Sequence, residues 1–168
     1  MPLKLYQKFL LIFFFLLIIP LVVVIVVSFQ VFKAKYVEIT YHDLYSRDML
    51  LEYSVKDFVK LDPNDSELET MISKAGRESD VRITIIAKDG TVAADSESNP
   101  KKMENHFNRP EIKDALLGFE GQSKRFSATL DKEFMYVAVP IYRDGGIVGA
   151  IRTSISFDRL LQCLKVYC

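Results

Sequence analysis

Residues Phe9 to Val27 form an uninterrupted apolar run, which constrains this chain more than any other feature. At about 1.5 Å per residue, a helix of this run together with Ser28 to Phe32 can cross a hydrocarbon core of roughly 30 Å. Pro20 lies in the middle of the run, and membrane helices tolerate proline. The alternative is a cleaved signal peptide, but the run exceeds a signal's apolar region and no A-x-A-like cleavage site follows it. We therefore predict a membrane anchor.

Charged residues lie almost entirely after this anchor. Of the 22 basic residues only Lys4 and Lys8 precede it, and all 22 acidic residues lie at or beyond Glu38. The remainder has a mildly acidic, ordinary globular composition, which argues against a nucleic-acid partner. Because Lys4 and Lys8 on one side of the anchor face Lys33 and Lys35 on the other, charge gives little indication of membrane orientation.

The chain has few side chains from which a catalytic or metal centre could be built. Cys163 and Cys168 are its only cysteines, and His42 and His106 are its only histidines. No G-x-S-x-G, P-loop or G-x-G-x-x-G pattern is present. We predict no catalytic residues, no cofactor and no metal site, so this chain is not expected to be an enzyme.

A long helix is predicted to follow the anchor, because no glycine or proline interrupts Ser28 to Leu61. Apolar residues recur in this segment at alternating spacings of four and three, and Asp48 occupies the one polar slot in the row. The apolar members of the row are Val37, Tyr41, Leu44, Leu51, Val55 and Phe58. The row fits either packing on the domain's own sheet, which we favour, or a two-helix dimer seam.

Two shorter helices and five strands are predicted beyond it. The first short helix begins with a capping box at Ser66 and ends at Gly76. The second is capped by Asn108, carries Glu111 at its third position and ends at Gly118. The predicted strands are Val81 to Ala87, Thr91 to Ser96, Gln122 to Asp131, Phe134 to Tyr142 and Ile147 to Phe157. This order indicates an α+β domain with a five-stranded antiparallel sheet.

Five short motifs follow one another between Val81 and Ser156. They are Asp89-Gly90-Thr91-Val92 with Asp95-Ser96, Met103-Glu104-Asn105-His106, Asn108-Arg109-Pro110-Glu111, Tyr136-Val137-Ala138-Val139-Pro140-Ile141 and Gly149-Ala150-Ile151-Arg152. In order and spacing they resemble the extracytoplasmic PAS-like (single-Cache-like) domain of phosphate-regulon-type sensor histidine kinases. An anchor helix immediately upstream matches the layout of that family.

The resemblance implies a division of the chain into five parts. These are a cytoplasmic stub (1–8), a transmembrane helix (9–32), a long juxtamembrane helix (33–62), a PAS/Cache-like sensor domain (63–157) and a C-terminal stub where a second membrane helix would begin (158–168). The last part is too short to span a bilayer, and neither histidine lies in a phosphoacceptor motif. We therefore expect the chain to be truncated before the second membrane helix and the kinase domains.

The function implied by the resemblance is that of a sensory input region of a two-component sensor histidine kinase. It would be anchored in the inner (cytoplasmic) membrane with its domain outside, and a signal would shift the long helix. Expected partners are the lipid bilayer, a second copy in a homodimer, and a small-molecule or protein signal. A membrane-anchored protein-interaction or adaptor module without a small-molecule ligand has the same layout and is the alternative. A pilin-like subunit fits less well, because a short leader and an early glutamate are missing.

Candidate ligand-binding residues are polar side chains on the loop and helix side of the sheet: His106, Arg109, Arg125, Tyr136 and Arg152. The forked donors of arginine suit a ligand that bears a carboxylate or phosphate. Each residue also has a structural interpretation. His106 could satisfy loop backbone groups, Arg109 could pair with a glutamate at the surface, Arg125 and Arg152 could be exposed cross-strand neighbours, and Tyr136 could belong to the core.

Overall fold

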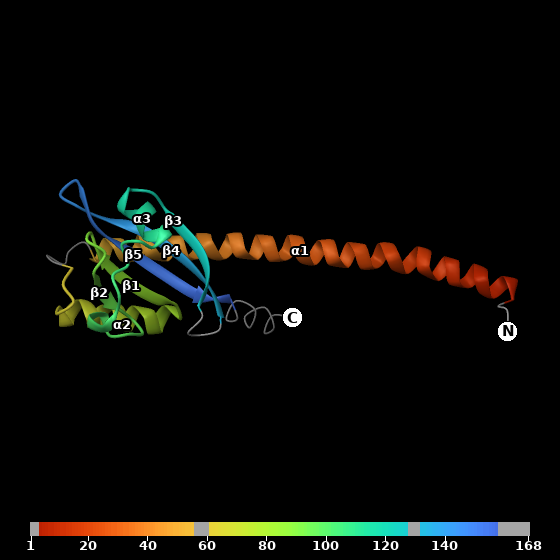
Figure 1. Ribbon diagram of the computed structural model, residues 1–168, viewed down its shortest axis with the longest axis horizontal. Helices are drawn as coiled ribbons and strands as arrows, with labels where there is room; N and C mark the ends of the chain where they lie inside the picture. Colours follow the sequence, from red (N-terminus) through yellow and green to blue (C-terminus); the bar gives the residue numbers. More distant parts are fainter. Residues whose placement is uncertain (1–3, 56–60, 128–131, 158–168) are drawn as a thin grey trace. The chain divides into compact units, whose positions relative to one another are not determined.

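In a computed structural model, the chain divides into two compact units, residues 1–40 and 41–168, and the structure describes residues 4–55, 61–127 and 132–157. The predictions for Phe58, for the end of the strand predicted up to Asp131, and for the segment 158–168 lie outside the described residues. The first unit is the N-terminal part of helix α1 (Leu5–Val55), and the second contains every other helix and strand (Figure 1).

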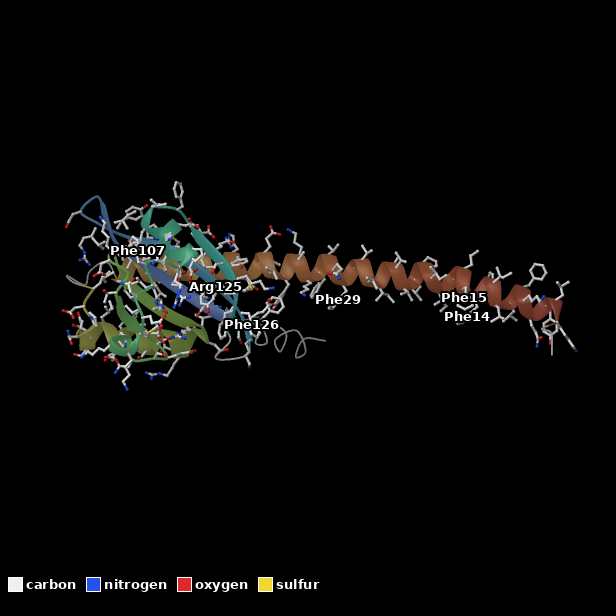
Figure 2. All side chains as sticks on the ribbon, viewed as in Figure 1. Phe14, Phe15, Phe29, Phe107, Arg125 and Phe126 are labelled. Carbon is white, nitrogen blue, oxygen red and sulfur yellow. The ribbon has the colours of Figure 1, made fainter. Side chains whose placement is uncertain are left out.

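Helix α1 is the element of the described chain that is long and apolar enough to cross a membrane. It continues through Pro20, as predicted. Phe14, Phe15 and Phe29 project outward from it (Figure 2), and these side chains are exposed. Since apolar side chains at such density are unfavourable in water, this part of α1 suits a hydrocarbon environment.

The second unit is built on one antiparallel sheet of five strands in the order β2-β1-β5-β4-β3. Its strands are β1 (Arg82–Ala87), β2 (Val92–Asp95), β3 (Gly121–Ser127), β4 (Lys132–Arg143) and β5 (Gly146–Ser156). The last strand of the chain, β5, lies in the centre and pairs with β1 on one side and β4 on the other. The predicted α+β fold with a five-stranded antiparallel sheet is confirmed.

Helices cover both faces of this sheet. The C-terminal part of α1 and helix α2 (Ser66–Ser79) pack on one face, where the larger apolar core contains Leu44, Val55 and Ile72. Helix α3 (Pro110–Leu116) packs on the other face, and a short 3-10 turn, η1 (Pro100–Lys102), contacts β2. We call these the α1 face and the α3 face.

The row of residues along α1 packs on the domain's own sheet from Tyr41 onward, which is the interpretation that the sequence favours. Leu44 and Val55 are fully buried in the core of the α1 face. Asp48, the polar member of the row, is equally buried and accepts a hydrogen bond from the Thr153 hydroxyl on β5 at 3.2 Å. The break in the apolar pattern therefore marks a specific contact.

The ends of α2 differ from the prediction. Its N-cap is Asp65 instead of Ser66, because the Asp65 carboxylate accepts hydrogen bonds from the backbone N–H groups of Glu67 and Leu68. Gly76 lies inside the helix, where a Cβ would collide with Ser96, so this glycine permits close packing and does not end the helix.

The start of α3 also differs. Its N-cap is Arg109 instead of Asn108, and Pro110 is the first helical residue, which places Glu111 second and not third. Gly118 follows the helix with a φ of 94°, so the predicted end is confirmed. The shift matters because position in the helix determines which way the Glu111 side chain points.

Truncation of Leu44 should show which side of helix α1 packs on the sheet. Leu44 is 1% exposed, so Leu44→Ala should lower the free energy of unfolding by about 2–5 kcal/mol. Leu50→Ala on the same helix, where the side chain is 75% exposed, should change it little. Denaturation of the full chain in detergent, followed by near-ultraviolet circular dichroism, measures both. An equal loss in the two variants would contradict the assigned packing face.

Candidate functional site

The α3 face of the sheet contains a buried arginine on its central strand. The side chain of Arg152 is 5% exposed, and one terminal nitrogen donates a hydrogen bond to the Thr84 hydroxyl on β1 at 3.1 Å. Its Nε atom is buried and has no hydrogen-bond partner within the described residues. Burial lowers the pKa of Arg152 to about 10, although the neighbouring Glu111 favours the charged form. Arg152 is therefore a buried cation whose Nε atom can still donate a hydrogen bond.

Glu111 of α3 supplies the counter-charge. Its carboxylate is completely buried and accepts hydrogen bonds from Arg125 at 2.6 Å and from the Ser123 hydroxyl at 2.9 Å, both on β3. The same carboxylate lies 3.6 Å from a terminal nitrogen of Arg152. Two guanidinium groups and a hydroxyl thus converge on one carboxylate.

Tyr136 of β4 lies between the two arginines. The centre of its ring is 4.4 Å from the guanidinium carbon of Arg125 and 5.2 Å from that of Arg152. Contacts of this kind between a cation and an aromatic face are attractive, and they strengthen when water is excluded. The ring therefore helps to hold both cations on one side of the sheet.

These contacts continue across the sheet as a line that we call the polar row. It consists of Asp95 on β2, Arg82 and Thr84 on β1, Arg152 on β5, Tyr136 on β4, and Ser123 and Arg125 on β3, with Glu111 added from α3. At its β2 end, the Asp95 carboxylate accepts hydrogen bonds from Arg82 at 3.1 Å and from Thr84 at 2.8 Å. Every strand of the sheet contributes at least one residue to the row.

The loop before α3 contributes His106, which is 6% exposed. Its Nδ1 atom is buried and has no partner within the described part of the chain. Burial, followed by the positive charges of Arg152 and Arg109, lowers the pKa of His106 to about 4. The ring is therefore neutral at physiological pH.

The His106 loop is attached to the turn between β1 and β2. The His106 backbone N–H donates to the Gly90 carbonyl at 2.8 Å, and the Asn105 side chain donates to the Asp89 carbonyl at 2.9 Å. Gly90 has a φ of 86°, and a Cβ there would collide with the Asn105 side chain. The position of the histidine is thus fixed by the β1–β2 turn, through its own backbone N–H and through the side chain of Asn105.

The structure brings three of the five predicted ligand residues into direct contact: Arg125, Tyr136 and Arg152 (Figure 2 labels Arg125). The interpretation of the two arginines as exposed neighbours is wrong, since Arg152 is buried and both interact with Glu111. The positive charges of Arg152 and Arg109 both lower the pKa of His106, so the neutral His106 ring lies within electrostatic reach of Arg152. A ligand-binding role for the five residues stays a prediction.

Sensor domains of chemoreceptors and histidine kinases have similar folds. The isoleucine-bound sensory domain of the Campylobacter jejuni chemoreceptor Tlp3 is 14% identical, with a TM-score of 0.62 over 76% of this chain and 56% of that one. The E. coli DcuS sensor domain is 16% identical, with a TM-score of 0.60 over 76% of this chain and 98% of that one. The V. cholerae histidine kinase DctB sensor domain is 16% identical, with a TM-score of 0.53 over 69% of this chain and 45% of that one. This chain thus spans a little over half of the Tlp3 domain.

Fold and site together define a sensor domain of the PAS/Cache type. The model of the single Cache-like family matches residues 61–156, and the chain belongs to that family. No curated protein matches the chain. The narrower assignment to phosphate-regulon-type sensors stays a prediction.

The lowered pKa of His106 predicts a pH dependence of stability. In the unfolded chain the pKa of histidine is about 6.5, above the folded value of about 4. The unfolded state then binds more protons between these values, so His106 should reduce stability progressively as the pH falls from about 6.5 to about 4. His106→Gln should remove this part of the dependence, which unfolding of both proteins across this range measures. Parallel stability curves for wild type and variant would contradict the assignment.

Proposed function

We propose that this chain is a membrane-anchored, extracytoplasmic sensory region of a two-component sensor histidine kinase. Residues 9–32 span the cytoplasmic membrane, the domain lies outside it, and two copies form a homodimer. The domain binds a small acidic molecule on the α3 face and passes a conformational change to α1. The chain itself performs no catalytic step in this proposal. The observation that carries it is the convergence of Arg125 and Arg152, which both lie over the Tyr136 ring, on a buried carboxylate.

The chemistry of the polar row favours an acidic ligand. Two arginines offer forked donors that match the two oxygens of a carboxylate. A buried donor without an acceptor is unfavourable, and the Nε atom of Arg152 is such a donor among the described residues. Tlp3 was crystallised with isoleucine bound, a molecule that carries a carboxylate, which supports the same ligand class here.

The space beside the polar row favours a small ligand. A pocket of about 210 Å³ is lined by residues that include Arg82, Phe134 and Ser154. The pocket adjoins the polar row at Arg82 and at Ser154, the partner of Tyr136 in the β4–β5 ladder, while Arg125 and Arg152 are not among its lining residues. Pockets for drug-sized ligands measure about 300–1,000 Å³, so an amino acid or a short organic acid suits this space better than a larger molecule.

The central strand offers a direct route from this site to α1. Arg152 points to the α3 face and its neighbour Thr153 points to the α1 face, where its hydroxyl donates to Asp48 at 3.2 Å. Burial raises the pKa of Asp48 well above its usual value, which favours the neutral carboxyl. A shift of β5 on ligand binding would therefore be transmitted to α1 through this hydrogen bond.

Ligand binding should depend on Arg125. Small mono- and dicarboxylic acids and amino acids should stabilise the full chain in detergent, by about 2.7 kcal/mol for a ligand at 100 times its dissociation constant. Arg125→Met should weaken the affinity about tenfold or more, because a hydrogen bond to a charged group contributes about 1.5–3 kcal/mol. Arg77→Met, which removes an exposed arginine on α2, should leave it unchanged. Absence of binding to the wild type would favour the adaptor alternative.

Signal transfer should depend on Thr153. Thr153→Val removes the hydroxyl that contacts Asp48 but leaves the α3 face intact, so ligand affinity should change less than about threefold. The ligand-induced change in amide hydrogen exchange over residues 41–55 should be strongly reduced. Thr70→Val on the exposed side of α2 is the matched control and should behave as the wild type. An unchanged response of α1 in Thr153→Val would exclude this route.

A further inference from the structure

Glu111 has the surroundings of a bound ligand more than those of a structural side chain. Its carboxylate is completely buried and touches two arginines and one hydroxyl, on strands β3 and β5. These are the donors with which proteins bind a free carboxylate. Here the carboxylate that these donors bind is a side chain of the same protein.

The carboxylate is not required for α3 to pack on the sheet. Ile112 and Ala115 are fully buried and already place the apolar side of α3 in the core of the α3 face. A buried ion pair is often no more stabilising than apolar residues of similar size, because both charges must lose their water. What Glu111 adds is a negative charge at the position where the two arginines meet.

The backbone also brings Glu111 close to the sheet. Gly121 of β3 has no side chain, and a Cβ there would collide with the Glu111 carbonyl group. Any other residue at Gly121 would push α3 outward and withdraw the carboxylate from Arg125. The close approach of α3 and the position of the charge therefore depend on each other.

We infer that Glu111 is a built-in ligand: its side chain occupies the carboxylate position of the arginine site, and an external acid reaches that position only by displacing Glu111 together with α3. The ligand class is then set by what Glu111 imitates, a single unbranched carboxylate. Competition with a tethered group lowers the apparent affinity for a free acid. The idea that an external acid displaces Glu111 rests on the proposed function. The idea that Glu111 fills the arginine site rests only on the contacts of its carboxylate.

Chemical rescue tests the occupancy directly. Glu111→Ala removes four atoms, which together correspond to acetate, and leaves the arginines without their counter-charge. In the full chain in detergent at pH 7, sodium acetate should raise the unfolding temperature of this variant by at least about 2 °C above the effect of sodium chloride at equal ionic strength. The wild type should show a much smaller difference at the same acetate concentration, because acetate must first displace Glu111 from the site.

Two controls define the site. Glu111→Gln keeps the volume and leaves no room for acetate, so acetate should not stabilise it beyond chloride. The double variant Glu111→Ala with Arg125→Met should lose the rescue, because one of the two donor groups is gone. If Glu111→Ala does not fold in chloride, the folded yield after refolding in acetate replaces the unfolding temperature as the readout.

The outcomes separate this inference from the proposed function. Rescue of Glu111→Ala that requires Arg125 supports the built-in ligand, even if no acid binds the wild type. Acetate that stabilises Glu111→Ala no more than Glu111→Gln or the wild type overturns it, even if acids bind the wild type elsewhere on the domain.

Discussion

The central strand β5 is the constraint on which the rest of the domain depends. It is paired on both sides and its two faces are covered by helices, so its middle residues have no access to solvent. Successive side chains of a strand point to opposite faces, which sends Arg152 under α3 and Thr153 under α1. A buried guanidinium without an acidic partner would be strongly destabilising. The presence of an acidic side chain at Glu111, on the helix that covers Arg152, follows from this requirement.

The two faces of the sheet hold their helices by different forces. The α1 face is largely apolar, and Asp48 provides its one buried acidic side chain among the described residues. The α3 face carries the polar row. Apolar contacts are non-directional and accept small sliding movements, whereas charge-assisted hydrogen bonds fix distance and angle. The helix that leads toward the membrane segment is thus held mainly by apolar contacts. Its directional bonds include those from Thr153 to Asp48, from Arg47 to the Ser79 carbonyl and from the Tyr142 backbone N–H to Glu52.

Local patterns were sufficient for the strands and for part of the site. Arg125, Tyr136 and Arg152 were expected from the sequence as polar side chains on the loop and helix side of the sheet, and the break in the α1 row identified Asp48. Glu111 was missed as a site residue, because an acidic residue in the first turn of a helix is already explained by the helix dipole. Its partners are visible only once α3 is packed on β3. Gly76 was misread for the same reason, since the residue it approaches lies on a different element.

The attachment of the His106 loop to the Gly90 turn has a mechanical consequence for α3. The loop enters the helix immediately before Glu111, and its backbone is bonded to the sheet's own hairpin. The helix is therefore held at its N-terminal end, while its other end leads into Gly118, whose φ of 94° is a conformation that glycine adopts readily. A helix held at one end can act as a lever. A displacement of Glu111 by the width of one carboxylate, close to the held end, would then become a larger swing at Leu117, far from the site that caused it.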